Sequence, residues 1–479
     1  MVPSPSRLRV WVDRLVGRGS DEGGEATCMT FRLALHVGSL LAAYYVIKPV
    51  REELILAAPH GAEFKAAATG LSALLLLMLM PLYDRLVLRW SRTRLLVVVT
   101  GAFVLSLAVF YGLCQWPPLR GLLGIPFYLW CSVFNMVTVT HFWALASEAG
   151  SVSHGERMFA VLGLGQSLGA VFGSQLATRL VAPDGRFGGV QVPTLLLLGA
   201  LLLLLSACIG LSSARALDRN GRVQASRSGP LPQGAFALVR SHRFLRLLAG
   251  LGLLVTLVNS NGEYLLSKTL LQDLSALSPE ARKGHVAGFF GQFYFEVSLC
   301  GLLIQALLVG RLMRPSGLRF SLMAFPLVAM AGSCAFVVVP VLQLLRVTKT
   351  AENAIDYSLN STGRHVLWLP MPAEVKYKAK QFVDTLIVRV GDLAASALVL
   401  LGGALLGLFG WSAHALQVLS GCNALLCLGW WWLAREVVRE YRRLAITSAR
   451  APPQQEAPIQ AQSSVAKNGA ERDGHSWVA

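Results

Sequence analysis

Long apolar runs recur along the whole chain, and shorter polar or basic stretches separate them. A membrane-spanning helix needs about 20 mainly apolar residues. About eleven runs meet this requirement, centred near Leu40, Leu75, Leu105, Phe134, Gly169, Leu201, Leu254, Leu299, Val328, Leu398 and Leu425. The pattern predicts an all-α, polytopic membrane protein.

The distribution of basic residues predicts one further span. Lys and Arg concentrate in alternate loops such as YDRLVLRWSRTR, GRLMRPSGLRF and EVKYKAK, whereas the intervening loops contain few. Cytoplasmic loops of membrane proteins are enriched in Lys and Arg. If all the basic loops are cytoplasmic, the chain must cross the membrane once more between Pro340 and Lys376. A total of about twelve spans then places both termini in the cytoplasm.

The segment available for this crossing, VLQLLRVTKTAENAIDYSLNSTGRHVLWLP, is too polar for an ordinary span. On a helix its polar residues share one arc, formed by Arg346, Lys349, Glu352, Asn353, Asp356 and Asn360. Such a helix crosses a membrane when its polar stripe faces a water-filled cavity and its charges pair. The alternative is an amphipathic helix on the membrane surface. Because the charge pattern requires a crossing, we expect the first arrangement.

The spans divide into two halves of six, with a weak internal repeat in the basic loops after the second and the eighth span. This is the layout of major facilitator transporters. We predict a cytoplasmic tail (1–30), a first half (31–211), a cytoplasmic linker rich in Ser, Gly, Arg and Pro (212–243), a second half (244–436), and a tail that is first basic and then disordered (437–479).

Composition supports this class of protein and excludes others. Of 479 residues, 54% are hydrophobic and only 14% charged, against about 25% charged in soluble domains. The net charge of +17 is explained by basic cytoplasmic loops, so we expect no nucleic acid partner. A disulfide scaffold, a fibrous protein and a disordered chain are excluded. No nucleophile–base pair, metal-ligand cluster or phosphate loop occurs at motif spacing, so we expect neither an enzyme nor a bound metal or cofactor.

Ionisable residues inside the spans mark the candidate site, because an unpaired one costs about 2.5–3.5 kcal/mol. We expect Pro49 to stop or kink the first span, which leaves Lys48 and Arg51 at a cavity mouth. There they either bind an anionic substrate or extend to the lipid headgroups.

The fourth span carries Asn135, His141 and Glu148. His141 is either a proton-coupling group or a hydrogen-bond partner of a neighbouring helix. Glu148 is either a site residue or a loop-edge partner of Arg157.

The fifth and seventh spans contain glycines with different expected roles. In the fifth, Gly165, Gly169 and Gly173 recur every fourth residue and predict close helix packing at the interface of the moving half. In the seventh, Asn259, Asn261 and Gly262 break the apolar run before Glu263. An interrupted helix with a carboxylate at membrane depth favours a binding site. The alternative is a Glu263–Lys268 contact near the outer surface.

The remaining candidates lie in the eighth and eleventh spans. Gln292 and Glu296 belong to the eighth, and Arg389 and Asp392 to the eleventh. Arg389 pairs with Asp392 or with Asp384, and that pair is either functional or purely structural.

Three segments resemble the non-mitochondrial ATP/ADP exchangers, the nucleotide transporters of plastids and intracellular bacteria, and their relatives in free-living bacteria. They are AAYYVIKPVREELIL, VFNMVTVTHFWALASEAGSVSHGERMFAVLGLGQSLGAVFG and KYKAKQFVDTLIVRVGDLAAS. The resemblance implies a twelve-span major facilitator fold that exchanges nucleotides by alternating access. It places functional charges of these exchangers at Arg51, Glu148 and Glu263. A fourth, which is a Lys in the exchangers, aligns with Asp392, and this anion repels phosphate unless Arg389 takes over the role.

We therefore predict a secondary transporter of the bacterial cell membrane that moves a small anionic metabolite, with nucleotide exchange as its leading activity. Substrate charge is neutralised by Lys48, Arg51, Lys349 and Arg389, while Glu148 and Glu263 pair with these cations in the empty state. Further cavity-lining or coupling candidates are Asn135, His141, Gln292, Glu296, Glu352 and Asp356. ATP or ADP is then cargo and not a cofactor.

Two alternatives differ from anion transport. One is proton-coupled transport of another solute through His141, Glu296 or Asp392. The other is a membrane module without transport activity that recruits a partner through its basic linker and tails.

Overall fold

The computed structural model describes residues 22–149, 155–182, 189–219, 234–309, 317–368, 371, 379–380 and 382–450, and within these ranges the regular structure is entirely helical. In lipid every backbone N–H and C=O group must be satisfied internally, so long runs of Leu, Ala and Val fold as helices. The expectation of an all-α membrane protein is confirmed.

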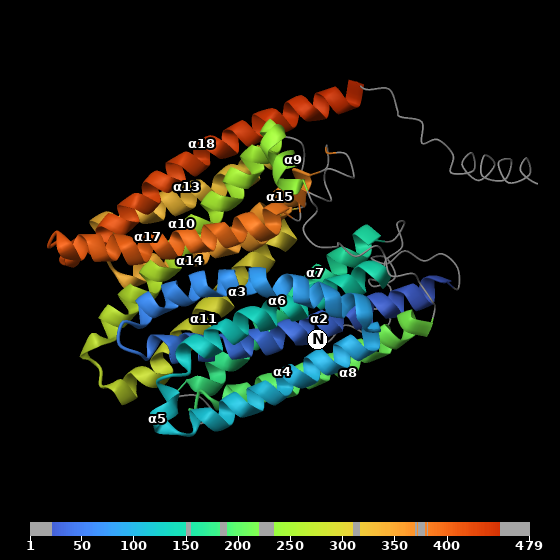
Figure 1. Ribbon diagram of the computed structural model, residues 1–479, viewed down its shortest axis with the longest axis horizontal. Coiled ribbons are helices and arrows are strands. Elements are labelled where there is room, and N and C mark those ends of the chain that lie inside the picture. Colours follow the sequence, from blue (N-terminus) through green and yellow to red (C-terminus); the bar gives the residue numbers. More distant parts are fainter. Residues whose placement is uncertain are drawn as a thin grey trace, which may run out of the picture.

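The first half of the chain supplies six long helices and one short one. They are α2 (Glu22–Leu56), α3 (Gly61–Arg89), α4 (Arg92–Cys114), the short α5 (Pro117–Arg120), α6 (Gly124–Ala149), α7 (Gly155–Val181) and α8 (Thr194–Arg219). Figure 1 shows them in blue to green as one group. Helix α2 packs against α6, α7 and α8, so it is the central helix of this half.

The second half begins after the short α9 (Ala235–Ser241). Its α-helices are α10 (Arg243–Asp273), α11 (Pro279–Ile304), α13 (Gly317–Val338), α14 (Leu342–Ile355), α15 (Ser361–Val366), α17 (Val388–Leu408) and α18 (Ala415–Arg450). Three π-helical turns adjoin them: η2 (Gln305–Val309) follows α11, η3 (Asp356–Asn360) lies between α14 and α15, and η4 (Val383–Ile387) precedes α17. The 3₁₀ turns η1 (Leu274–Ala276) and η5 (Ser412–His414) lie in loops.

Eleven helices of the described residues are long and apolar enough to cross a membrane. The polar segment forms one further continuous helix, 342–366, because η3 joins α14 to α15 without a break. Helix α14 packs against α10, α11 and α13, and its polar residues Lys349, Glu352 and Asn353 are buried. The segment therefore packs among the helices of the bundle, with these polar residues turned inward. About twelve helices in two halves form the bundle, as predicted.

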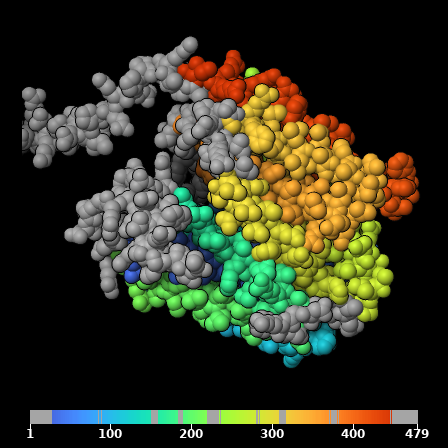
Figure 2. Space-filling view, turned by 180° about the vertical axis from the view of Figure 1, so that it is seen from behind, coloured from blue at the N-terminus to red at the C-terminus, as the bar shows by residue number. Residues whose placement is uncertain are grey.

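The two halves meet along three main seams. Helix α7 packs against α11, α3 against α17, and α2 against α11. Figure 2 shows the first seam from behind, where the teal α7 borders the yellow α11. We call the end of the bundle at which α3, α8 and α18 terminate the basic end, and the end at which α2 terminates the opposite end; in Figure 1 the basic end is on the right.

The glycines of α7 allow unusually close helix packing, as their spacing predicts. A Cβ atom on Gly169 would lie 2.0 Å from the carbonyl oxygen of Gly38 on α2. Gly165 and Gly173 approach the carbonyl oxygens of Ala34 and Ala42 in the same way, at 2.5 and 2.4 Å. The contact lies inside the first half, between α2 and α7, and not at an interface between the halves.

The expected stop at Pro49 and the expected break near Gly262 are absent. Helix α2 continues through Pro49 to Leu56, and α10 runs unbroken through Gly262. In a bundle, neighbouring helices and local adjustments compensate for the hydrogen bond that a proline removes. A Cβ atom on Gly262 would lie 2.9 Å from Nζ of Lys349, so this glycine provides room for a lysine from α14 instead of breaking its own helix.

The helices extend beyond several predicted boundaries. Helix α2 begins inside the predicted tail (1–30), and α18 continues past residue 436 to Arg450. The predicted linker (212–243) contains the end of α8 and all of α9. Residues 1–21, 220–233 and 451–479, which include the predicted disordered tail, lie outside the described residues.

Candidate functional site

A polar cavity of about 260 Å³ lies between the two halves. Its walls come from α2, α3 and α6 of the first half and from α10, α11, α14, η3 and α17 of the second. Four cationic side chains, Lys48, Arg51, Lys65 and Arg389, line the cavity together with two carboxylates, Glu263 and Asp392. Five of the ten tyrosines of the chain also line it: Tyr44, Tyr128, Tyr264, Tyr294 and Tyr357. The cavity thus combines an excess of positive charge with aromatic surface.

Glu52 is the buried anion behind the cavity wall, with none of its surface exposed. Its carboxylate accepts hydrogen bonds from Arg51 and forms an ion pair with Lys65 at 2.8 Å. Tyr294 of α11 donates its hydroxyl to the same carboxylate at 3.0 Å. Because a carboxylate without partners is costly to bury, these contacts hold Glu52 charged and fix the two cations at the wall.

Lys65 connects the two halves of the protein. Besides Glu52 on its own side, its ammonium contacts Glu263 of α10 at 3.5 Å and donates a hydrogen bond to Ser267 of α10 at 2.9 Å. Only 5% of Lys65 is exposed. A carboxylate from each half therefore competes for one buried cation.

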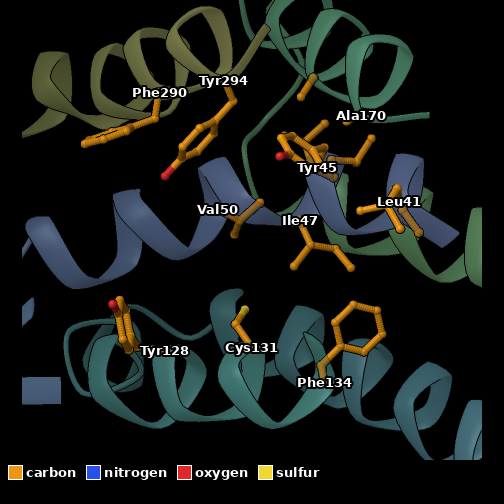
Figure 3. Packing of buried hydrophobic residues seen from close by; sticks show 14 of the residues in the cluster. Leu41, Tyr45, Ile47, Val50, Tyr128, Cys131, Phe134, Ala170, Phe290 and Tyr294 are labelled. Carbon is orange, nitrogen blue, oxygen red and sulfur yellow. The ribbon is translucent and has the colours of Figure 1, made fainter. Parts of the chain in front are cut away.

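Lys48 has aromatic neighbours where the other cations have carboxylates. Its ammonium lies 3.7 Å from the centre of the Tyr294 ring and 5.3 Å from that of Tyr45. Within the described part of the chain, no carboxylate lies close enough to form an ion pair with it. Figure 3 shows Tyr294 directing its hydroxyl from α11 toward α2, while Tyr128 stands on α6 across α2. Ring faces attract cations, so the tyrosine rings hold the Lys48 ammonium in place at the cavity wall.

Arg389 and Asp392 form an ion pair on α17 at 3.0 Å, and Ser260 of α10 donates a hydrogen bond to Asp392 at 3.3 Å. Residues three apart share one face of a helix, which explains why Arg389 pairs with Asp392 and not with Asp384. The two charges cancel locally, although both side chains line the cavity.

Lys349 lies behind the cavity wall, with 1% of its surface exposed. It pairs with Glu352 at 2.9 Å and donates a hydrogen bond to Asn259 of α10 at 3.0 Å. The next residue on this stripe, Asn353, lines the cavity and donates a hydrogen bond to Glu263 at 3.3 Å. The polar stripe of α14 thus reaches the cavity through Asn353, while Lys349 and Glu352 stabilise each other.

The structure replaces the proposed Glu263–Lys268 contact with a different pair. Lys268 binds Glu63 of α3 at 2.6 Å, and Tyr264 donates to the same carboxylate at 3.2 Å. Five residues correspond to about 140° around a helix, so side chains at 263 and 268 point to different sides. Glu63 with Lys268 joins the two halves near the opposite end of the bundle.

A second contact joins the halves at that end. Glu53 of α2 accepts a hydrogen bond from the backbone N–H of Gly284 in α11 at 3.0 Å and pairs with Arg120 at 2.8 Å. Together with the Glu63–Lys268 pair, it holds the halves together beyond the cavity.

Several predicted candidates do not line the cavity. His141 lies in the first half beside a small separate cavity with His36 and Ser206. Glu296 pairs with Arg346, Asp356 accepts a hydrogen bond from Asn360, and Glu352 belongs to the Lys349 pair. Asn135 is half-buried and Gln292 is exposed. The side chains of Glu148 and Arg157 lie outside the described residues.

Sequence reasoning missed Lys65, Glu52 and the tyrosines. Lys65 falls in the first turns of α3, where a lysine usually extends to the headgroups. A signal was nevertheless present, since the five tyrosines that line the cavity all fall within segments that already carried candidate charges. Among the described residues, no group of three or more His, Cys, Asp or Glu side chains is arranged to hold a metal ion.

Comparison with models of protein families and with curated proteins finds no match. Solved structures do match over most of the chain. One is a bacterial homologue of the human lysosomal transporter Spinster, in an inward-facing and unoccupied conformation. The match has a TM-score of 0.54 at 13% sequence identity, and it spans 91% of this chain and 100% of the homologue's chain. The fold is that of the major facilitator transporters.

Two further structures agree with this fold. The human organic anion transporter MFSD10 (TETRAN) has a TM-score of 0.54 at 18% identity, covering 85% of this chain and 99% of its own. The nucleoside transporter NupG has a TM-score of 0.56 at 11% sequence identity, and the match spans 87% of this chain and 99% of the NupG chain. At these identities the likeness establishes the major facilitator fold alone.

Proposed function

We propose that the protein is a secondary transporter that moves an organic anion across a membrane by alternating access, with a nucleotide as the leading cargo. The observation that carries the proposal is the cavity between the halves of a major facilitator fold, where four cations face two carboxylates. Polar and ionisable groups at membrane depth are costly and mark substrate pathways. A non-transporting module has no use for such a site.

The ion pairs of the cavity suggest how an empty and a loaded site are both tolerated. Without cargo, Glu263 shares Lys65, and Asp392 neutralises Arg389. An incoming anion competes with these carboxylates for the cations, while Lys48 offers a positive charge that no described carboxylate occupies. Because Lys65 and Glu263 belong to different halves, an anion that binds Lys65 weakens a contact between the halves. Binding is thereby coupled to their relative movement.

The tyrosines favour a nucleotide over a simple inorganic anion. An aromatic base stacks on tyrosine rings, and phosphates bind Lys and Arg. The resemblance to ATP/ADP exchangers supports the same cargo, and Lys65 adds to the cavity a cation that Asp392, in place of the expected Lys, does not provide. The cavity volume of about 260 Å³ lies just below the usual range of about 300–1,000 Å³ for organic ligands. A nucleotide therefore requires the cavity to widen, whereas a smaller anion fits directly.

Transport assays in proteoliposomes test the proposal. We expect uptake of labelled ATP or ADP to rise when unlabelled nucleotide is loaded inside. Uptake of phosphate alone would assign a smaller anion, and uptake that follows the proton gradient but ignores nucleotide would assign proton-coupled transport. No uptake of an anion in preparations shown to be folded would refute anion transport itself.

A matched pair of variants links the activity to the cavity. Arg51→Gln removes a lining cation and should raise the KM for the anion about tenfold or more, the effect of losing one buried charge-assisted contact worth about 1.5–3 kcal/mol. Arg94→Gln removes a cation that stacks on Trp90, away from the cavity, and should leave KM unchanged. Equal effects of the two substitutions would mean that Arg51 does not contact the cargo.

We also propose that the protein lies in the bacterial cell membrane with both termini in the cytoplasm. The support is the concentration of Lys and Arg at the basic end, since such residues favour the cytoplasmic side. Reporter fusions at both termini test this orientation, and termini on different sides would refute it.

A further inference from the structure

A second concave site lies at the basic end, between α13 and α18. Its volume is about 170 Å³, and apart from Val438 its lining consists of arginines: Arg319 from the first turn of α13 and Arg435, Arg439 and Arg442 from α18. None of these residues lines the polar cavity. Four guanidinium groups that converge from two helices repel one another unless an anion lies between them.

The protein neutralises only one of these charges within its described residues. Glu436 pairs with Arg439 and also lies 3.5 Å from Arg243. Arg435 stacks on the ring of Trp431 at 4.9 Å, which orients the guanidinium without neutralising it. For Arg319, Arg435 and Arg442, no carboxylate of the described chain lies within ion-pairing distance. Guanidinium groups bind phosphate through paired N–H donors, so the missing anion is of the phosphate type.

The surface next to the site indicates the source of this phosphate. Exposed apolar residues precede the arginines on one face of α18: Leu425, Leu428 and Trp432 are 68%, 49% and 58% exposed. The alternating spacing of three and four residues continues without interruption to Arg435, Arg439 and Arg442, so all six side chains lie on one helix face. Along that face the surface changes from apolar to basic, in the order in which a lipid presents its acyl chain and its phosphate.

Tryptophans place the change in surface character at the level of the lipid headgroups. Trp431 and Trp432 lie four and three residues before Arg435, and tryptophan is enriched at membrane–water interfaces. A free phosphate ion would use the arginines but not the apolar surface beside them. Basic pockets between membrane helices are known to hold anionic headgroups. We infer that the groove between α13 and α18 binds the headgroup of an anionic phospholipid, with its acyl chains along the exposed face of α18.

Lipid retention by the purified full-length protein tests the inference. The probes are cardiolipin and phosphatidylglycerol, with phosphatidylcholine as the neutral reference, and bound lipid is counted by native mass spectrometry after titration in detergent. About 1 kcal/mol per basic residue corresponds to about fivefold in affinity. Arg435→Gln with Arg442→Gln should therefore weaken cardiolipin binding about 25-fold and leave phosphatidylcholine binding unchanged.

A neighbouring arginine provides the matched control. Arg443 is adjacent in sequence, pairs with Glu440 at 3.5 Å and does not line the groove. Arg443→Gln removes the same charge from the same surface and should change cardiolipin binding less than twofold. Arg442→Lys keeps the charge but loses the forked donors, so it should give an intermediate loss, and it serves as the reporter if the double variant does not fold.

Three results would overturn the inference. Equal losses from Arg443→Gln and the groove variants would indicate nonspecific surface charge. Displacement of bound cardiolipin by millimolar inorganic phosphate, with the same stabilisation of the protein, would assign the groove to a soluble anion. Unchanged lipid retention in all the groove variants would mean that the arginines bind no lipid.

Discussion

Replacing Lys65 with Met removes the buried cation that joins the two halves. Lys65 contacts Glu52 at 2.8 Å and Glu263 at 3.5 Å, and only 5% of it is exposed. Met keeps most of the side-chain volume, so the change removes charge without a large cavity. Glu52 then retains only Arg51 and Tyr294, and Glu263 loses its ion pair across the halves.

The expected loss in the free energy of unfolding depends more on the burial of Lys65 than on its distances to the two carboxylates. At an effective dielectric constant of about 20, the Coulomb attraction is about 6 kcal/mol for the contact at 2.8 Å and about 5 kcal/mol for that at 3.5 Å. Desolvation of the ammonium offsets several kcal/mol of this sum. Breaking a buried pair by removing one partner costs about 3–5 kcal/mol, and we expect Lys65→Met to lie in that range.

The second pair between the halves provides the control. Lys268 lies only 2.6 Å from Glu63, so distance alone ranks it at least as strong, but both side chains are 29% exposed. Partly exposed pairs contribute about 1 kcal/mol or less, and Lys268→Met should cost no more than that. Equilibrium unfolding of the purified protein in mixed micelles titrated with a denaturing detergent measures both changes.

A compensating substitution tests whether charge is the cause. Adding Glu263→Gln to Lys65→Met restores the charge balance and should recover about 1–2 kcal/mol, within the range measured for coupled contacts. If Lys268→Met destabilises the protein as much as Lys65→Met, or if Glu263→Gln recovers nothing, burial does not control the strength of these pairs and the reasoning is wrong.

Three other changes have definite expected outcomes. Gly169→Ala places a Cβ atom 2.0 Å from a backbone oxygen of α2 and should lower the thermal midpoint strongly, whereas Gly101→Ala on α4 meets open space and should be neutral or slightly stabilising. Gly262→Ala displaces Lys349 and should cost about 1–3 kcal/mol in the same unfolding assay, the usual range for overpacking. Arg389→Gln should raise the KM for the transported anion in proteoliposomes, and an unchanged KM would remove Arg389 from the anion site.

The main features of the fold follow from physical rules that act on the chain locally. Apolar runs longer than the bilayer thickness fold as helices, so eleven spans could be predicted by length. The polar helix 342–366 could not be predicted by hydropathy. It was predicted because Lys and Arg favour the cytoplasmic side of a membrane, and the basic loops lie on one side only if the chain crosses once more. The glycine spacing of α7 similarly predicted close packing, since only helix periodicity is needed to place the three residues on one face.

The site depends on contacts between helices that are far apart in the sequence, and local rules do not predict such contacts. Lys65 resembles an ordinary helix-end lysine until α10 brings Glu263 beside it. His141 and Glu296 look equally suited to the cavity in the sequence, yet their helix faces point elsewhere in the bundle. The alternative contact between Glu263 and Lys268 could be set aside from the sequence, because a separation of about 140° on one helix argues against it.

The interlocked backbones of α2 and α7 have a mechanical consequence. With Gly169 against Gly38 there is no side-chain layer between the two helices that could yield, so neither can slide or rotate without the other. Helix α7 forms the seam with α11, and α2 carries Lys48 and Arg51. A movement of α7 relative to α11 therefore moves α2 as part of the same rigid unit. It changes the positions of Lys48 and Arg51 in the cavity at the same time.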